Sequence, residues 1–184
     1  MDRIPTKTNP RLFDYAILKL QTALADGLPW LNYSFGNCER LTDVKDGRKF
    51  HSANIYVGGG KYEQIMPCAE LGNFSFFYLR DPQTFGTNDR NLLKTPFSLI
   101  VWCDMRKVSL PTDERNKEAI KGQILDILGR REFSSWLTLG KLYEKPENIF
   151  ADFSYEHYNN QFLMSPYAGV RIDGEMTLRI PCND

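Results

Sequence analysis

The residues of this chain that could do chemistry are few, and the first group is a glycine run beside a lysine. Gly58-Gly59-Gly60 comes directly before Lys61, an arrangement that suggests a loop for binding phosphate. The established phosphate-binding loop needs two glycines that frame four residues, followed by Lys and then Ser or Thr, between a strand and a helix. Here Tyr62 follows the lysine, and the residues beyond it have no helical pattern. We therefore interpret the run as the tip of a hairpin.

The histidines are the second candidates, because a neutral imidazole can act as a general base. The chain has His51 and His157, and neither lies beside a serine or cysteine in a recognisable nucleophile motif. We therefore expect a protein that is not an enzyme. A hidden pair of Cys68 with His51, in a small cytoplasmic enzyme, stays open as an alternative.

The cysteines form no recognisable metal or disulfide pattern. They are four isolated residues without a Cys-x-x-Cys pair: Cys38, Cys68, Cys103 and Cys182. Structural zinc sites usually draw on such pairs, so we expect no metal and no cofactor. Free thiols in a reducing compartment fit the same spacing.

Aromatic residues make up 13% of the chain and gather in two segments, 74–78 and 155–167. Platforms that stack single-stranded nucleic acid interleave such residues with Lys and Arg, and the first segment has no cation before Arg80. We therefore expect core packing for the first segment. The second, with Tyr158 and Tyr167, suits a subunit interface. A nucleic-acid-binding module that uses the aromatic sheet stays open as an alternative.

The overall composition is that of one globular domain covering residues 1–184, with 42% hydrophobic and 25% charged residues. The 23 basic and 23 acidic residues cancel, so no long-range field attracts nucleic acid. No apolar run approaches the roughly 18 residues that a membrane helix needs. Residues 1–5 lack the apolar core of a signal peptide. We expect no membrane contact and synthesis in the cytoplasm.

Two amphipathic helices are expected, because apolar residues recur at intervals of three and four. The first helix is predicted over residues 10–26 and the second over 113–128, with Thr112 as the N-cap of the second. Their apolar stripes consist of Phe13, Ile17, Leu20 and Leu24 in the first and of Ile120, Ile124, Ile127 and Leu128 in the second.

The remaining pattern predicts strands. They are expected over residues 30–41, 49–57, 74–79, 97–105 and 170–180, with a tight turn at Asp46-Gly47. The strand at 97–105 is apolar on both faces, which is typical of the centre of a sheet. The last strand alternates apolar with polar residues, which predicts a sheet that is covered on one side only. Residues 80–95 are polar and are expected to form a long exposed loop. Residues 133–142 are ambiguous between helix and strand, and 149–164 are irregular with room for one more short helix.

These elements together predict an α+β fold, an antiparallel β-sheet with two main helices packed on one face. In the last strand, Arg171 and Asp173 belong to the row that is expected to face water. That row mixes both signs of charge and has no catalytic arrangement.

The order of the blocks resembles that of virion structural proteins of tailed phages that infect Bacteroides-like hosts, in the tail-terminator, tail-completion or neck-ring class. The resemblance covers most of the chain and rests on structural motifs. These are Phe35-Gly36 with Cys38 and Arg40, the Asp46-Gly47 hairpin, Ile55-Tyr56-Val57 with Tyr62, Asn73-Phe74-Ser75-Phe76-Phe77, the run from Phe97 to Asp104, and the run from Gln161 to Ile172.

The resemblance implies a tail-terminator-like subunit that forms a six- or twelve-fold ring at the head–tail junction of the virion. Its partners would be other copies of itself and neighbouring portal, neck or tail proteins. The ring would line or surround the channel through which DNA passes. Because the net charge is near zero, we expect the DNA to pass without specific binding. Such a subunit is made in the cytoplasm of the host bacterium.

A ring needs two different complementary patches on each subunit. We expect the loops at residues 57–62 and 80–95, together with the second aromatic segment, to supply them. The interface residues predicted on this basis are Lys61, Tyr62, Arg80, Asp89, Arg90, Tyr158 and Tyr167.

Overall fold

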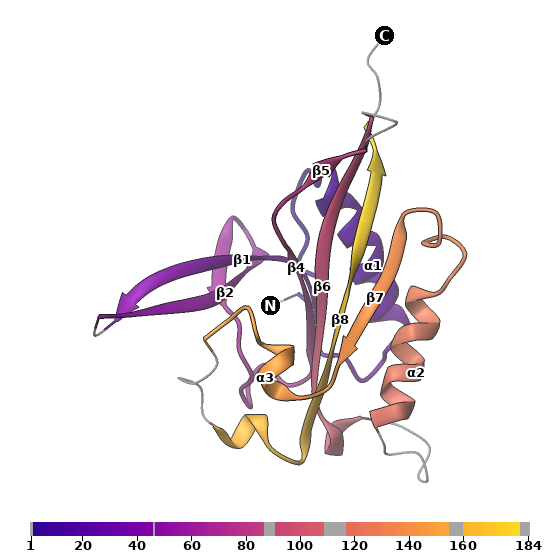
Figure 1. The fold of residues 1–184 in the computed structure, drawn as a ribbon. Helices are drawn as coiled ribbons and strands as arrows, with labels where there is room; N and C mark the ends of the chain where they lie inside the picture. The colour runs from indigo at the N-terminus through magenta and orange to yellow at the C-terminus, as the bar shows by residue number, and fades with distance from the viewer. Residues whose placement is uncertain (1, 46, 87–90, 109–116, 155–159, 181–184) are drawn as a thin grey trace.

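The computed structural model of the protein describes residues 2–45, 47–86, 91–108, 117–154 and 160–180. The fold is α+β, as predicted, with three α-helices among the described residues (Figure 1). The helices are α1 (Phe13–Gly27), α2 (Lys117–Leu128) and α3 (Pro146–Ile149), with 3-10 turns η1 (Met105–Lys107) and η3 (Asn160–Leu163). The strands are β1 (Tyr33–Lys45), β2 (Arg48–Gly58), β3 (Lys61–Gln64), β4 (Phe74–Leu79), β5 (Thr84–Phe85), β6 (Leu92–Asp104), β7 (Leu137–Tyr143) and β8 (Tyr167–Arg179).

All the strands belong to one eight-stranded sheet with the order β3-β2-β1-β4-β6-β8-β7, and β5 pairs with the start of β6. Neighbouring strands are antiparallel except β1 and β4, which are parallel. The apolar strand predicted at residues 97–105 lies inside β6, between β4 and β8, as its composition indicates. Of the predicted Asp46-Gly47 turn, Asp46 lies outside the described residues; beside it, Lys45 lies opposite Arg48 and Gly47 has a φ of 74°, as a tight hairpin requires.

Both predicted helices pack on the same face of the sheet. The apolar stripes of α1 and α2 are buried against alternate residues of β6 and β8. The start predicted for the second helix, including Thr112, lies outside the described residues. The ambiguous segment 133–142 contains a turn and then β7, and the irregular segment 149–164 contains the end of α3 and η3.

The prediction that the sheet is covered on one face only is wrong, because the opposite face has a core of its own. Phe74, Phe76 and Trp102 point to that face and are at most 1% exposed. Phe150 and Phe153, just after α3, cover them, with ring centroids 5.1 Å apart for Trp102–Phe150 and 5.8 Å for Phe76–Phe153. Because β4 and β6 have apolar residues on both faces, the sheet needs a cover on each.

The polar row of the last strand is also not where the alternation predicts. Arg171 and Asp173 are only 4% and 8% exposed, because the segment around α3 lies over this part of β8. Toward its far end the row reaches solvent, where the Glu175 side chain is 44% exposed and Arg179 is exposed. The alternation correctly predicts which residues of β8 share a face. It does not reveal that the segment around α3 covers the polar face and forms ion pairs with it.

The polar segment 80–95 is shorter as a loop than predicted. Thr84 and Phe85 form β5, and β6 begins at Leu92, so the last part of the segment belongs to the sheet. Thr95 is fully buried there. The prediction of an exposed loop is therefore wrong for 92–95, where pairing with β8 satisfies the backbone.

Two glycines in β8 make room for large cross-strand neighbours. Gly169 lies opposite Trp102 and Gly174 opposite Phe97. A Cβ on Gly169 would lie 2.2 Å from Cε3 of Trp102 and 2.6 Å from the carbonyl oxygen of Val101. Each aromatic ring therefore covers the backbone of the glycine that it faces.

Replacing Gly169 with alanine is expected to lower the free energy of unfolding by about 1–3 kcal/mol, because the added methyl group collides with a buried ring and a backbone oxygen. Denaturant unfolding measures this change. Gly122 in α2 is the matched control, since a Cβ there meets no atom within 4 Å. Gly122→Ala should instead stabilise the fold by about 0.5–1 kcal/mol. Equal effects of the two substitutions would contradict the packing described for Gly169.

Candidate interface surfaces

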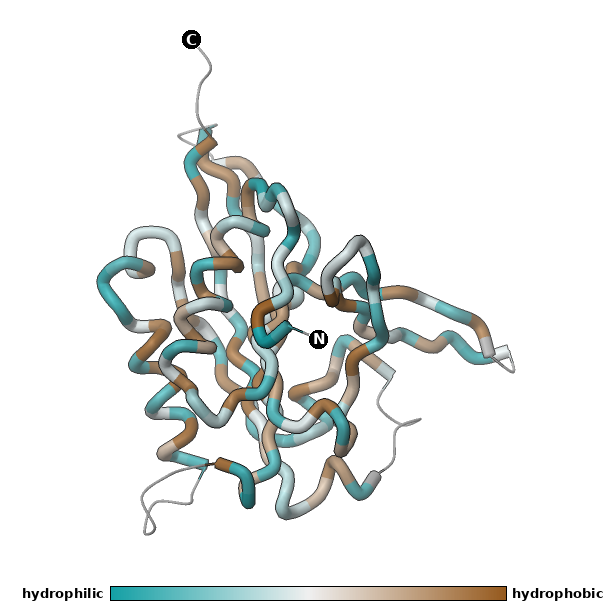
Figure 2. Tube along the Cα trace, turned by 180° about the vertical axis from the view of Figure 1, so that it is seen from behind, coloured by the Kyte–Doolittle hydropathy of each residue, from teal (hydrophilic) through white to brown (hydrophobic). Residues whose placement is uncertain are grey.

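The outer part of the β1–β2 hairpin, residues 39–45 and 47–52, is largely exposed, and we call it the arm. It projects sideways from the body of the molecule (Figure 1), and hydrophobic residues occur on it far from either core (Figure 2). Leu41 is 48% exposed and Val44 is 70% exposed. Leu41 and Val44 are three residues apart on one strand, so each face of the arm presents one of these exposed apolar side chains.

The arm is attached to the body at its root by Ser154. The amide of His51 donates to Oγ of Ser154 at 3.0 Å, and the carbonyl of His51 accepts from the amide of Ser154 at 2.9 Å. The backbone groups of His51 therefore point away from β1. Opposed residues in an antiparallel pair have the same orientation, so the N–H and C=O of Thr42, opposite His51, point away from β2.

The outer edge of β1 on the arm is consequently open. The pairing of β1 with β4 ends at Asn37, and no described strand pairs with β1 beyond that residue except β2. Val44 lies two residues after Thr42 and has the same orientation, so its N–H also points outward. This row of outward backbone groups can accept another strand.

A second open edge lies at the other end of the sheet, on β7. The amide of Thr177 donates to the carbonyl of Trp136 at 2.8 Å, so alternate residues from Trp136 onward bond to β8. Leu139 lies between such residues and directs its N–H outward. Leu139 and Leu142 are 36% and 37% exposed, and both lie on the helix side of the sheet.

The predicted interface residues Lys61 and Tyr62 lie on β3, the last strand at the arm end of the sheet order, and both are exposed. The glycine run before them forms the tight turn between β2 and β3, as predicted, with positive φ at all three glycines. The ring of Tyr62 lies edge-on to Tyr56, with centroids 5.6 Å apart. Desolvation, opposed by the charge of Lys7, raises the pKa of Tyr62 above its ordinary value.

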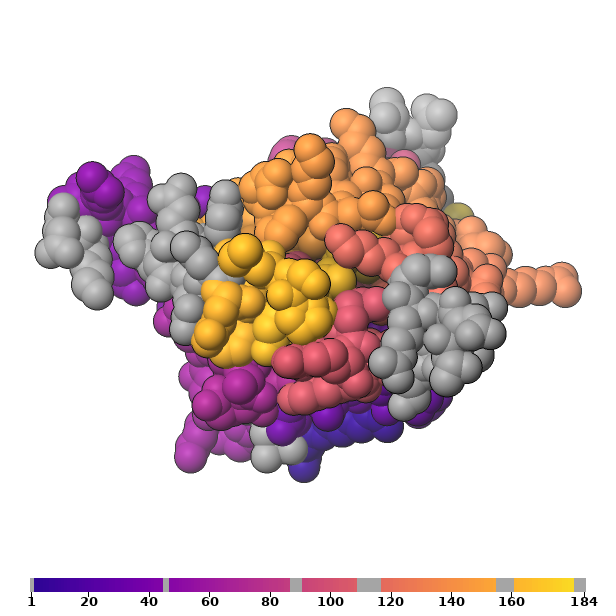
Figure 3. Space-filling view, turned by 90° about the horizontal axis from the view of Figure 1, so that it is seen from below, coloured from indigo at the N-terminus to yellow at the C-terminus, as the bar shows by residue number. Residues whose placement is uncertain are grey.

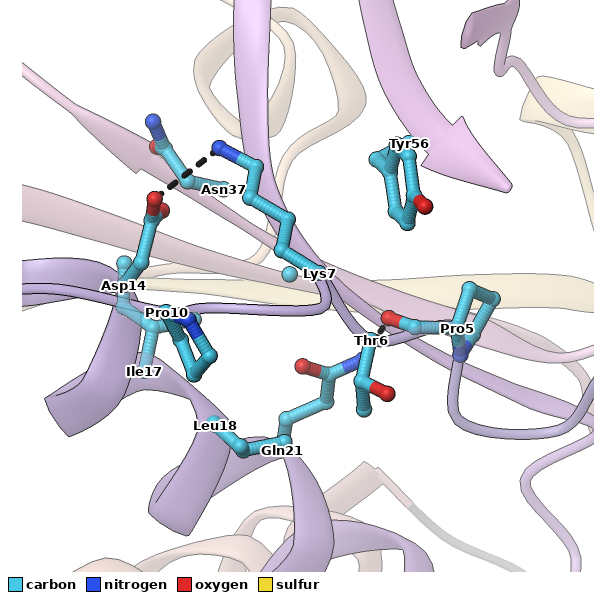
Figure 4. A pocket seen from close by; sticks show the side chains of 11 residues that line it. Pro5, Thr6, Lys7, Pro10, Asp14, Ile17, Leu18, Gln21, Asn37 and Tyr56 are labelled. Carbon is cyan, nitrogen blue, oxygen red and sulfur yellow. Dashed lines mark hydrogen bonds and ion pairs between the residues drawn. The ribbon is translucent and has the colours of Figure 1, made fainter. Parts of the chain in front are cut away.

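The small pocket in Figure 4 lies between the N-terminal segment, α1 and the start of β1. Lys7 and Asp14 face each other across its rim, with Nζ 3.0 Å from Oδ2. Burial lowers the pKa of Lys7, but the bond to Asp14 offsets this and the pKa is raised overall. Deeper in the pocket, Nε2 of Gln21 donates a hydrogen bond to the carbonyl of Pro5 at 3.0 Å. Three of the pocket's polar side chains, those of Lys7, Asp14 and Gln21, are therefore already bonded within the protein.

Arg80 was predicted at an interface, and its guanidinium turns toward the sheet. Its Nη2 lies 3.2 Å from Oδ2 of Asp173, in a cluster that continues to Arg171 and Asp152. Nε of Arg171 donates to Oδ1 of Asp173 at 2.7 Å, and its Nη1 lies 2.7 Å from Oδ2 of Asp152. Oγ of Ser98 also donates to Asp173, at 2.8 Å. The sequence gives no signal for this cluster, because its members come from four separate segments.

Tyr167 lies at the lower end of the sheet, beside a hollow of about 970 Å³ that opens to solvent. Figure 3 looks onto this end, where the segments near residues 105 and 165 lie side by side. The guanidinium of Arg106 is 5.8 Å from the Tyr167 ring centroid and makes two side-chain bonds to Asp104. These bonds lower the pKa of Asp104. Met164, 65% exposed, extends the apolar part of this surface.

Three of the predicted interface residues, Asp89, Arg90 and Tyr158, lie outside the described residues, as does His157. The structure therefore places Lys61 and Tyr62 together on β3, and puts Arg80 and Tyr167 at two other sites.

The open alternatives depend on side chains that have other contacts. Nδ1 of His51 lies 2.9 Å from Oγ1 of Thr42, and no described contact joins it to Cys68. Phe74, Phe76 and Phe77 are fully buried, so none of these rings is available to stack on a base. Core packing of this segment is thus confirmed. In the part of the chain that is described, no three metal-binding side chains gather into a possible site.

Among the described residues, no helix is long and apolar enough to cross a membrane. Comparison with known proteins finds no protein family whose model matches this chain and no curated protein that matches it.

Proposed function

We propose that this protein is a structural subunit that assembles into a closed ring at the head–tail junction of a tailed-phage virion. The observation that carries the proposal is the pair of open strand edges, one on the arm and one on β7. They are different surfaces at different places in one chain. Contacts between two different patches repeat head to tail and close into a ring when the rotation allows it.

The resemblance to tail-terminator and neck-ring proteins supplies the place of the ring in the particle. Its partners are further copies of the chain, six or twelve in a ring, and the portal, neck or tail proteins above and below. The balance of 23 basic and 23 acidic residues suits a channel wall along which DNA slides, because tight binding requires clustered cations.

The test is assembly of the purified protein. Its mass is measured by light scattering across a range of concentrations, alone and mixed with the portal, neck and tail proteins encoded beside it. We expect a six- or twelve-subunit species, visible as rings by negative-stain electron microscopy. A chain that stays monomeric in every mixture would refute the proposal.

A further inference from the structure

We propose that the open edge of β1 on the arm, residues 40–44, adds as a strand to the open edge of β7 in a second copy of this chain. The inference rests on the proposed ring and specifies the contact that builds it. Among the described strands none pairs with the outward backbone groups of either edge, and the natural partner of such groups is another strand.

The occupant is a second copy because the arm cannot reach its own β7. In the sheet order, β4, β6 and β8 separate β1 from β7, and the arm projects away from the β7 side of the body (Figure 1). One molecule therefore has a donor edge and an acceptor edge that it cannot join to each other. When the arm of one subunit joins β7 of the next, a linear row of subunits still has one open arm at one end and one open β7 edge at the other. Closing the row into a ring joins these two as well.

The side chains of the two edges match in their apolar character. On β7, Leu139 and Leu142 present a half-exposed apolar row on the helix side of the sheet. Leu125 of α2 extends that row: it is 38% exposed and lies one helical turn after Lys121, whose Nζ pairs with Glu144 just beyond β7. When the two edges pair antiparallel, their outward residues lie opposite each other with side chains on the same face, so Val44 of the arm, 70% exposed, is set against this row.

The charges also match. Glu39 and Asp43 lie on either side of Leu41 in the same row of β1, because side chains two apart on a strand share a face. On β7 the exposed cation Lys141 lies between the two leucines. Lys141 shares its face with Tyr143, the face opposite the leucines, and Glu39 and Asp43 come to that face when Val44 packs against the leucines, so a carboxylate comes next to this ammonium.

The third exposed strand, β3, is a weaker candidate for strand addition. It has only four residues, Lys61 to Gln64, and they are polar or charged except for the tyrosine. Short charged edges are the usual protection against pairing with other chains. β7 has seven residues and two exposed leucines.

The test uses proline, which removes one backbone donor and is tolerated on an open strand edge. Val44→Pro removes an outward N–H of β1, and Leu139→Pro removes an outward N–H of β7. Lys49→Pro is the matched control. Lys49 lies directly opposite Val44 on the same rung of the arm, and its N–H points to the other edge of the arm.

We expect Val44→Pro and Leu139→Pro each to weaken the contact between subunits about tenfold or more, measured by light scattering over a dilution series. Lys49→Pro should assemble like the unmodified chain. Circular dichroism and thermal unfolding of the three variants check that each is folded. A variant that has lost its fold is replaced by an N-methyl amino acid at the same position, introduced by semisynthesis, which removes the same N–H.

A mixture of the two edge variants gives a sharper result. The Val44→Pro chain keeps its β7 edge and the Leu139→Pro chain keeps its arm, so an equal mixture treated with a chemical cross-linker should give two-subunit products and no rings. If both variants form rings as readily as the unmodified chain, the strand addition is wrong while the ring stands. If the unmodified chain forms no ring with any partner, the proposed function itself fails.

Discussion

Replacing Arg171 with leucine is expected to lower the free energy of unfolding by about 3 kcal/mol, because it removes a buried guanidinium that bridges two carboxylates and leaves Asp173 with Arg80 as its remaining described cation. The Arg171 side chain is 5% exposed and bridges Asp173 in its own strand to Asp152 beyond α3. In a protein of this size the change corresponds to a fall in melting temperature of about 10 °C.

Chemical denaturation and differential scanning calorimetry measure the loss. Arg131→Leu is the control, since Arg131 is exposed and the only hydrogen bond described for it uses its backbone carbonyl. It should change the free energy of unfolding by no more than about 0.5 kcal/mol. Arg171→Lys keeps the charge but loses the planar fork, so an intermediate loss is expected. A loss at Arg171 as small as the control would show that the cluster contributes nothing to stability.

Replacing Phe150 with alanine is expected to cost about 3–5 kcal/mol, because the ring is fully buried against Trp102 and its removal leaves a cavity. This substitution tests whether the second core stabilises the fold as the helix-side core does. Phe85→Ala is the matched control, since Phe85 is 64% exposed in β5. Guanidinium unfolding should give a loss near zero for Phe85. If Phe150→Ala also gives a loss near zero, the second core, on the face of the sheet opposite α1 and α2, does not stabilise the fold.

The parts of the fold that follow a local repeat could be predicted from the sequence. The stripe from Phe13 to Leu24 gives α1, and the apolar residues around Phe97 give the central strand. Gly47 marks the hairpin turn, because a tight two-residue turn needs a positive φ. Each of these signals involves residues that are close together in the chain.

The second core could not be predicted in this way. The segment that forms it, around Phe150 and Phe153, has no helical or strand period, and its partners are more than forty residues away in β4 and β6. The same holds for Arg171, which looks like a solvated residue in an alternating strand until the segment around α3 is placed over it. The open edges of β1 and β7 also depend on strand order, which the sequence does not reveal.

The attachment of the arm has a mechanical consequence for an assembled particle. The arm meets the body through Ser154, and two residues earlier Asp152 is held by Arg171 in β8. A load applied to the tip therefore passes through a short stretch of chain into the middle of the sheet. The arm should therefore move as a rigid extension of the sheet. A displacement of one subunit would then be transmitted to the sheet of the subunit that it contacts.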